Sequence, residues 1–180
     1  MASSASLLPP PGLEVRCCCH AAKGALRVGA DAAIPLAFKG RITLRVEDSL
    51  RIGLGGRSLW LTDFAAIAQS PVLGEVVLRA AEFDTTPFSL IELTAAAPPT
   101  FRQTLFFDFT LSIETPPGCA GPAVLTNKAT ARLIDDRLTG FPPQGALHRL
   151  HQPVDLVLLG EPDRVVAQLV EFPVTVVHQL

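Results

Sequence analysis

Tyrosine is absent from this 180-residue chain, and Trp60 is its only tryptophan. Lectins and antibody-like binding surfaces depend on amphipathic aromatic rings, so this shortage disfavours a role in sugar or antigen binding. An excess of one charge is also missing, because 15 Lys and Arg residues stand against 17 Asp and Glu residues. The basic residues are scattered singly. The sequence therefore predicts no nucleic-acid partner, since such a partner requires a basic stripe.

Long apolar runs are missing as well, although 48% of the residues are hydrophobic and the mean hydropathy is +0.36. No uninterrupted apolar segment is long enough to cross a bilayer, so we expect a soluble chain without a membrane span. The apolar residues must then be buried in a core, in an interface between subunits, or around an apolar ligand.

The N-terminal segment lacks a basic start and contains only two adjacent leucines as an apolar stretch, so it is not a secretory signal peptide. We expect residues 1–12 to form a disordered tail and residues 13–180 to form a single β-rich domain. Three of the four cysteines are consecutive and Cys119 stands alone. This spacing does not fit a disulfide framework, and it favours a reducing, cytoplasmic location.

Alternation of apolar and polar residues predicts two long strands, over residues 34–46 and 101–114. Gln103 and Phe106 are the two exceptions to the alternation in the second strand. Proline and glycine residues bound both ends of that strand, which marks its limits. Further strands are expected at residues 88–94, 154–159 and 165–177. Residues 75–83 fit one face of a helix as well as a buried strand, and the strand is favoured.

The dipeptide Gly55-Gly56 permits the positive φ angles of a tight hairpin. With a turn there, Ile52 lies opposite Leu59 and the apolar residues share one face. A loop before residue 50 then gives a three-stranded meander. Its expected strands are residues 34–46, 50–54 and 57–62.

Two segments are expected to be helical: a turn at residues 62–70, before Pro71, and a short helix at residues 127–138. Many one-sided strands joined by turns rich in proline and glycine indicate an antiparallel sheet. The predicted fold is mainly β, an antiparallel β-sandwich or barrel with one or two short helices.

Cysteine thiolates and imidazoles are zinc ligands, which makes Cys17, Cys19, His20, His148 and His151 a candidate metal set. Against it, adjacent residues of a strand point to opposite faces, and the paired C-x-x-C arrangement is missing. A small buried apolar role for some of these thiols is the alternative, and no cofactor is predicted.

Three residues are candidates for binding an apolar ligand: Glu92, Phe106 and Trp60. Glu92 belongs to a segment that is otherwise apolar on both faces, and Phe106 projects from the face opposite the other phenylalanines of its strand. No G-x-S-x-G motif is present, and no lysine of a phosphate loop follows the glycines near residue 55. We therefore assign no catalytic residue and favour a protein that is not an enzyme.

These observations leave three functional hypotheses. The first is a non-catalytic β-sandwich that self-associates or binds a protein partner. The second is a β-barrel that binds an apolar small molecule, with isomerase or cyclase activity as an option. The third is a metal-binding protein that uses cysteine and histidine. Because residues 75–83 and 165–177 are apolar on both faces, we expect a homo-oligomer, with a two-fold dimer favoured.

Overall fold

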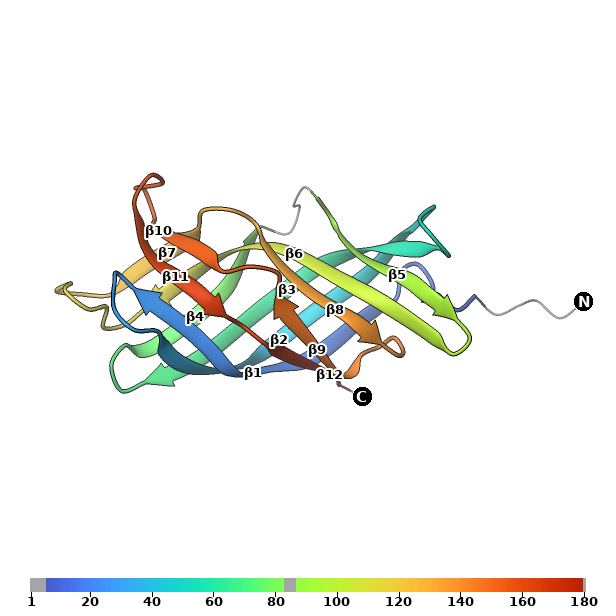
Figure 1. Cartoon of the computed structure of the whole chain (residues 1–180), viewed down its shortest axis with the longest axis horizontal. Helices are drawn as coiled ribbons and strands as arrows, with labels where there is room; N and C mark the ends of the chain where they lie inside the picture. The colour runs from blue at the N-terminus through green and yellow to red at the C-terminus, as the bar shows by residue number, and fades with distance from the viewer. Residues whose placement is uncertain (1–5, 83–86, 180) are drawn as a thin grey trace, which may run out of the picture.

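The chain folds into twelve antiparallel strands in the computed structural model, which describes residues 6–82 and 87–179 (Figure 1). All twelve belong to one sheet, so the predicted mainly β, antiparallel architecture is confirmed. The strands are β1 (Glu14–Val28), β2 (Ile34–Leu50), β3 (Gly56–Ser70), β4 (Gly74–Glu82), β5 (Ser89–Ala96), β6 (Pro99–Ile113), β7 (Ala123–Asn127), β8 (Ala131–Leu138), β9 (Gln144–Leu150), β10 (Val154–Leu158), β11 (Val165–Glu171) and β12 (Val174–His178).

The sheet closes on itself as a barrel. β1 pairs with β2 on one side and with β11 and β12 on the other, so the first and last strands meet. β4 and β5 both lie between β3 and β6, at different levels, and together they fill one position in the ring. β7 with β8, β9 with β10, and β11 with β12 fill three more positions in the same way. With the four continuous strands β1, β2, β3 and β6, this gives an up-and-down barrel with eight positions.

Period-two alternation explains the continuous strands, because one face of each is buried inside the barrel and the other meets solvent. A proline marks one break between split strands, since Pro173 separates β11 from β12 and has no N–H for the ladder. Close packing requires glycine at one position of β2. A Cβ atom on Gly40 would lie 1.9 Å from the backbone oxygen of Ala65 on β3.

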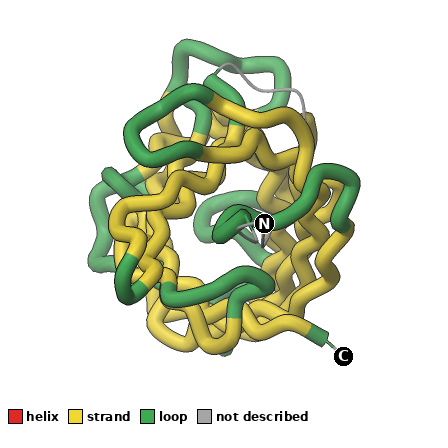
Figure 2. The backbone as a smooth tube through the Cα atoms, turned by 90° about the vertical axis from the view of Figure 1, so that its right-hand side faces the viewer, coloured by secondary structure: helices red, strands yellow, loops and turns green. Residues whose placement is uncertain are grey.

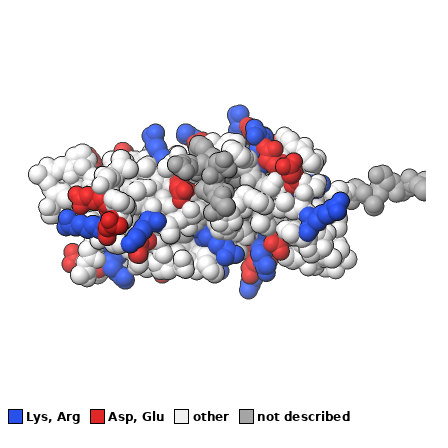
Figure 3. All heavy atoms as spheres, turned by 90° about the horizontal axis from the view of Figure 1, so that it is seen from above, with Lys and Arg blue, Asp and Glu red and all other residues white. Residues whose placement is uncertain are grey.

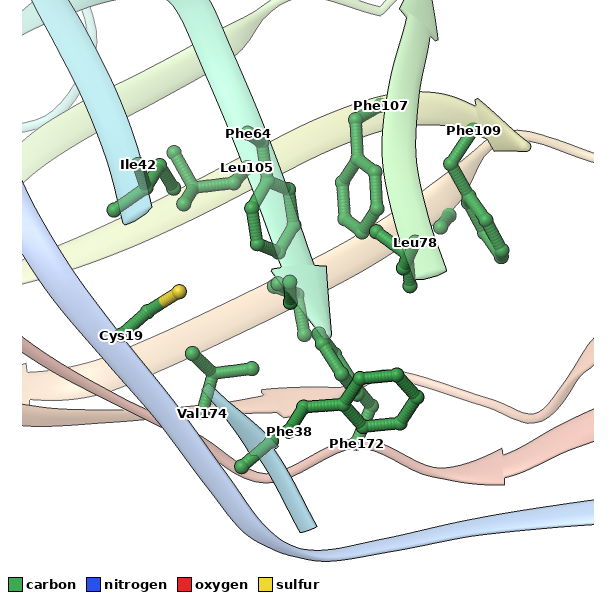
Figure 4. Close-up of a cluster of buried hydrophobic side chains, with 14 of the residues drawn as sticks. Cys19, Phe38, Ile42, Phe64, Leu78, Leu105, Phe107, Phe109, Phe172 and Val174 are labelled. Atoms are coloured by element: carbon green, nitrogen blue, oxygen red, sulfur yellow. The ribbon is translucent and has the colours of Figure 1, made fainter. Parts of the chain in front are cut away.

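Phenylalanine rings fill the middle of the barrel (Figure 4). The rings of Phe38 and Phe172 meet edge to face with 5.3 Å between their centroids, and those of Phe64 and Phe107 do so at 5.0 Å. Phe107 also packs against Phe109 at 5.5 Å. Such pairs prefer this edge-to-face geometry and contribute beyond the area that they bury. The predicted apolar face of residues 101–114 is therefore the core of the barrel.

Neither predicted helix is present, and no residue in the described ranges is helical. Residues 62–70 continue β3, because Phe64, Ala66 and Ala68 alternate into the core and pair with β2 and β4. Residues 127–138 form the end of β7 and all of β8. In both segments the pairing with neighbouring strands overrides a helix propensity that is weak in itself.

The predicted meander is also wrong in its register, although the turn lies close to Gly55. β2 runs on through residues 47–50 and pairs directly with β3, so that Leu50 lies opposite Gly56 and Val46 opposite Leu59. The register of β2 against β3 shifts between Val46 and Ser49, as at a β-bulge. This shift keeps the apolar residues pointing inward without the loop that we expected before residue 50. Ile52 lies in the connecting turn and is exposed.

The N-terminal segment lies at one end of the barrel. Viewed from that end, the strands form a ring, and the loop that leads into β1 lies within its outline (Figure 2). Pro9 is buried and its carbonyl oxygen accepts a hydrogen bond of 3.0 Å from Arg57, while the Gly12 N–H bonds to the Val46 carbonyl. Residues 1–5 lie outside the described part of the chain. A disordered tail over residues 1–12 and a single domain over residues 13–180 remain predictions.

Positive and negative side chains are interspersed on the face shown in Figure 3. Several form ion pairs within the sheet surface, among them Arg41 with Asp63 at 2.6 Å. This surface resembles that of an ordinary solvated sheet, and it presents no basic stripe on this face. No helix within the described residues is long and apolar enough to cross a membrane.

Candidate functional site

Three polar side chains lie side by side on the inner surface of the barrel. Gln103 of β6 is the register partner of Asp135 of β8, and the pairing of Ile134 with Arg149 places Asp135 level with His148 of β9. Their exposed fractions are 0% for Gln103, 7% for Asp135 and 1% for His148. We call these three residues the polar row. Almost everything else that points into the barrel is apolar, so their burial needs an explanation.

One hydrogen bond links two members of the polar row. Nε2 of His148 and Oε1 of Gln103 are 2.9 Å apart, and both groups are buried. In this arrangement the imidazole Nε2–H donates to the amide oxygen. Within the described chain, Nε2 of Gln103 has no hydrogen-bond partner, and Nδ1 of His148 has none that meets full hydrogen-bond geometry, although the backbone of Ala146 lies close enough to favour the protonated ring. Leaving a buried donor or acceptor unpaired costs about 1–3 kcal/mol for each group.

The unmet hydrogen bonds do not depend on how the two side chains are oriented. If His148 Nε2 donates, the free groups are an acceptor on Nδ1 and the two amide N–H donors of Gln103. If the amide is turned so that its nitrogen donates to the ring, the free groups are the Nδ1–H donor, the second amide N–H donor and the Oε1 acceptor. Either way, the pair retains two donors and one acceptor beyond the bond that links the two side chains.

Burial lowers the pKa of His148 from 6.5 to about 4, because the charged imidazolium would lose its hydration inside the barrel. The negative charge of Asp135 and a backbone interaction with Ala146 both favour the charged ring, but together they do not offset the effect of burial on the pKa. His148 is consequently neutral at pH 7, and its ring can accept a hydrogen bond. One oxygen of Asp135 accepts a hydrogen bond of 2.8 Å from the backbone N–H of Arg137.

A slot in the barrel wall leads to the polar row. β8 and β9 pair only where Leu133 and Ile134 meet Leu150 and Arg149. Beyond these pairs the structure records no pairing between residues 135–138 and 144–148, all of which are described. A cavity of about 770 Å³ lies between the diverging strands. Its lining includes inward-facing residues of both strands, namely Asp135, Leu138 and Ala146.

The slot and the polar row share Asp135, whereas His148 and Gln103 are beside Asp135 in the sheet and do not line the slot. His148 is two residues from Ala146 on β9 and therefore points to the same side of the sheet. Because no pairing between the two strands is recorded along the slot, their backbones can move apart there without breaking ladder hydrogen bonds. The slot is a hollow with a lining of polar and apolar residues, and Asp135 is the member of the polar row that lines it.

The three sequence candidates for ligand binding lie elsewhere. Trp60 is 38% exposed on the outer face of β3. Glu92 is half-buried on β5, with a carboxylate oxygen 3.7 Å from the guanidinium of Arg102. Phe106 is half-buried, and the guanidinium carbon of Arg132 lies 5.6 Å from its ring centroid. None of the three lines the slot or belongs to the polar row, and a ligand role for them remains a prediction.

The five metal candidates do not converge. Cys17, Cys19 and His148 are buried, whereas His20 and His151 are exposed. Among the residues that the structure describes, no group of three or more cysteine, histidine, aspartate or glutamate side chains could hold a metal ion. Burial, together with the neighbouring Cys18, raises the pKa of Cys17 to about 11 and that of Cys19 to about 12. Both are protonated thiols of the core, which agrees with a small apolar role.

Sequence reasoning identified His148 but missed its partners. Gln103 interrupts an alternating strand at an inward position, and that interruption was visible in the sequence. Asp135 gave no comparable signal, because it fell within a segment assigned to a helix. Its place in the row depends on the register of β8 against β6.

Comparisons with known proteins identify the fold. No protein-family model matches the sequence, and no curated protein sequence matches it. Among solved structures, the chain is similar to DynF from the dynemicin biosynthesis pathway of Micromonospora chersina, with a TM-score of 0.72. The similarity covers 97% of this chain and 84% of DynF, at 16% sequence identity. At this level of identity, the similarity shows a shared fold alone.

Proposed function

We propose that the chain binds one apolar small molecule inside the barrel, with a polar group of that molecule held by His148 and Gln103. The observation that carries this proposal is the buried pair with an unmet donor and an unmet acceptor. A protein gains little from leaving such groups unsatisfied, whereas a ligand that completes their hydrogen bonds gains affinity and orientation. The second of our three hypotheses is therefore preferred.

The dimensions of the slot support this function. Phenylalanine rings fill the middle of this barrel, so the room for a ligand lies in the slot between β8 and β9. The slot provides about 770 Å³, within the range of small-molecule sites. DynF, which shares the fold, belongs to a biosynthetic pathway, and a fold used in such a setting is compatible with a small-molecule role.

The state of His148 supports binding rather than proton transfer. A general base works best when its pKa lies near the working pH, and the pKa of His148 is lowered to about 4. A neutral imidazole has one ring nitrogen that can accept a hydrogen bond from a ligand. We therefore propose a binding protein and assign it no reaction.

Titration with the neutral fluorescent dye Nile red tests the proposal. We expect saturable binding with one dye per chain, and loss of that binding in the Ala146→Trp variant, whose indole fills the slot. Ala37→Trp is the matched control, because Ala37 is exposed on the outer face of β2. Circular dichroism and the melting temperature establish that both variants fold. Equal dye binding by a folded Ala146→Trp variant, or no saturable binding by the wild-type chain, would overturn the proposal.

We also propose a homodimer, formed through the outer face of the barrel. Leu59 pairs with Ser89, which makes the adjacent Trp60 and Phe88 neighbours on that face. Trp60 is 38% exposed and Phe88 52%. Rings of this size in contact with water favour an interface. Light scattering across a range of concentrations should show a dimer that Trp60→Ser weakens, and a monomer that persists on concentration would contradict it.

A cytoplasmic location remains part of the proposal. All four cysteines are free thiols in the structure, which suits a reducing compartment. Fractionation of cells that express a tagged chain checks this location. Recovery of the chain from an oxidising compartment would contradict it.

A further inference from the structure

A second hollow, of about 630 Å³, lies on the outer face of the barrel, where β1, β12 and β9 run side by side (Figure 1). We call it the outer groove. It shares only Leu147, Arg149 and Leu150 with the slot, and no residue of the polar row lines it. Its chemistry can therefore be considered apart from that of the slot.

Irregularities in two neighbouring strands form the outer groove. The register of β1 against β2 shifts between Ala21 and Gly24, so that Ala22 and Lys23 are both exposed. Bulges of this kind re-aim side chains and are frequent next to active sites. On the facing side, β11 ends and β12 begins, and the structure records no pairing between residues 21–24 and 172–174, all of which are described. The outer surface is hollowed where this ladder is interrupted.

The registers bring two cationic side chains to opposite sides of the outer groove. β12 pairs with β1 on one side and with β9 on the other, so β1 and β9 run in the same direction. Extended to the groove, these registers place Lys23 of β1 and Arg149 of β9 level with Pro173 of β12. Two strand spacings separate their Cα atoms, about 10 Å. Both residues are exposed, and their long, flexible side chains can lean over Pro173 towards one ligand group.

Neither cation is neutralised within the described part of the chain. Other arginines on the outer face form ion pairs, Arg41 with Asp63 and Arg45 with Glu47, but Lys23 and Arg149 form none there. Glu171 also lines the outer groove, and it leaves one positive charge in excess. The groove therefore favours an anion.

We propose that the outer groove binds a small organic anion, with an anionic oxygen group such as a carboxylate between Lys23 and Arg149 and an apolar body along the groove. Ammonium and guanidinium groups form charge-assisted hydrogen bonds with such oxygens. The apolar body packs on the apolar part of the lining, which includes Ala22, Leu147, Leu150, Val170 and Pro173. A neutral molecule would leave both cations unpaired. This site does not depend on the proposed function of the slot.

Fluorescence titration with 8-anilinonaphthalene-1-sulfonate tests the proposal, and N-phenyl-1-naphthylamine is the matched neutral probe because it has the same rings without the sulfonate. We expect saturable binding of the anionic probe. Lys23→Met should weaken it about threefold and Lys23→Met/Arg149→Met about tenfold, as one and two partly exposed ion pairs produce. Neither variant should change the binding of the neutral probe by as much.

Lys39→Met is the matched control, because Lys39 is exposed beside His20 on the same outer face but does not line the outer groove. It removes the same charge and should leave the affinity for the anionic probe unchanged. Equal weakening by Lys23→Met and Lys39→Met, or no saturable binding by the wild-type chain, would overturn the inference.

Filling the slot separates the two sites. A folded Ala146→Trp variant should bind the anionic probe as the wild type does, because Ala146 lines the slot and not the outer groove. Loss of the anionic probe in that variant would place the probe in the slot and overturn the inference. The titration with Nile red tests the slot alone, so either proposal can fail while the other stands.

Discussion

Removing the titratable group of His148 should make the barrel less sensitive to acid. The His148→Gln variant keeps a side chain that can bond to Gln103 but cannot become charged. In the wild-type chain, acid must place a proton on an imidazole that is surrounded by apolar residues and is 1% exposed. Unfolding releases the ring into water, where it binds that proton readily.

The structure sets both the sign and the size of the effect. The pKa of His148 is lowered in the folded chain, from 6.5 to about 4, so its contribution to stability is complete above pH 6.5 and is lost as the pH falls towards 4. At about 1.4 kcal/mol for each pH unit, that interval corresponds to about 3 kcal/mol. Small domains have total stabilities of about 5–15 kcal/mol, so the loss is measurable.

Urea unfolding at several pH values between 7.5 and 4 measures the difference. Carboxylates also titrate in this range, so the informative quantity is the free energy of unfolding of the wild-type chain minus that of His148→Gln at each pH. We expect this difference to fall by about 3 kcal/mol as the pH is lowered. His20→Gln is the matched control, since His20 is exposed, and it should follow the wild type. A difference that stays constant with pH would refute the reasoning.

Three other changes test the packing of the barrel. Gly40→Ala should lower the free energy of unfolding by about 2 kcal/mol or more, because the new Cβ would lie 1.9 Å from a backbone oxygen of β3. Gly121→Ala is the control, since a Cβ at that position meets nothing within 4 Å and should change the stability little. Iodoacetamide at pH 8 should alkylate exposed Cys119 in the folded chain and spare Cys19, whose pKa is about 12, as mass spectrometry of the digested protein would show. Deletion of residues 1–12 should lower the melting temperature, because it removes buried Pro9 and the hydrogen bonds of Pro9 and Gly12 with the barrel, and an unchanged melting temperature would instead support the predicted disordered tail.

Much of the fold could be predicted from periodicity. The strands over residues 34–46 and 101–114 were found because one face of each meets water, which produces period-two alternation. β8 was mistaken for a helix because its polar residues, Asp135 to Arg137, interrupt the alternation near a bulge. Closure into a barrel was beyond the sequence, because it depends on which strands pair and not on which residues alternate.

The candidate site was predictable only in part. His148 was identified as a candidate from the sequence, but it was placed among the metal candidates. Glu92 drew attention as an acid in an apolar segment, yet its side chain lies on the outside, near Arg102. A strand that is apolar on both faces gives no sign of which face is inside. The register of three separate strands brings Gln103, Asp135 and His148 together, and no local pattern encodes that register.

The ring is closed at one place by strands from opposite ends of the chain. Among the described residues, every other pairing joins ring positions that follow one another in the sequence, whereas β1 pairs with β11 and β12, and Cys17 lies opposite His178. Hairpins can therefore form early and locally, while the cost of bringing distant segments together falls on this last step. Without this pairing, the remaining strands would form an open sheet with two free edges and an apolar inner face. Free edges of that kind are sites of aggregation, so closure of the ring removes them.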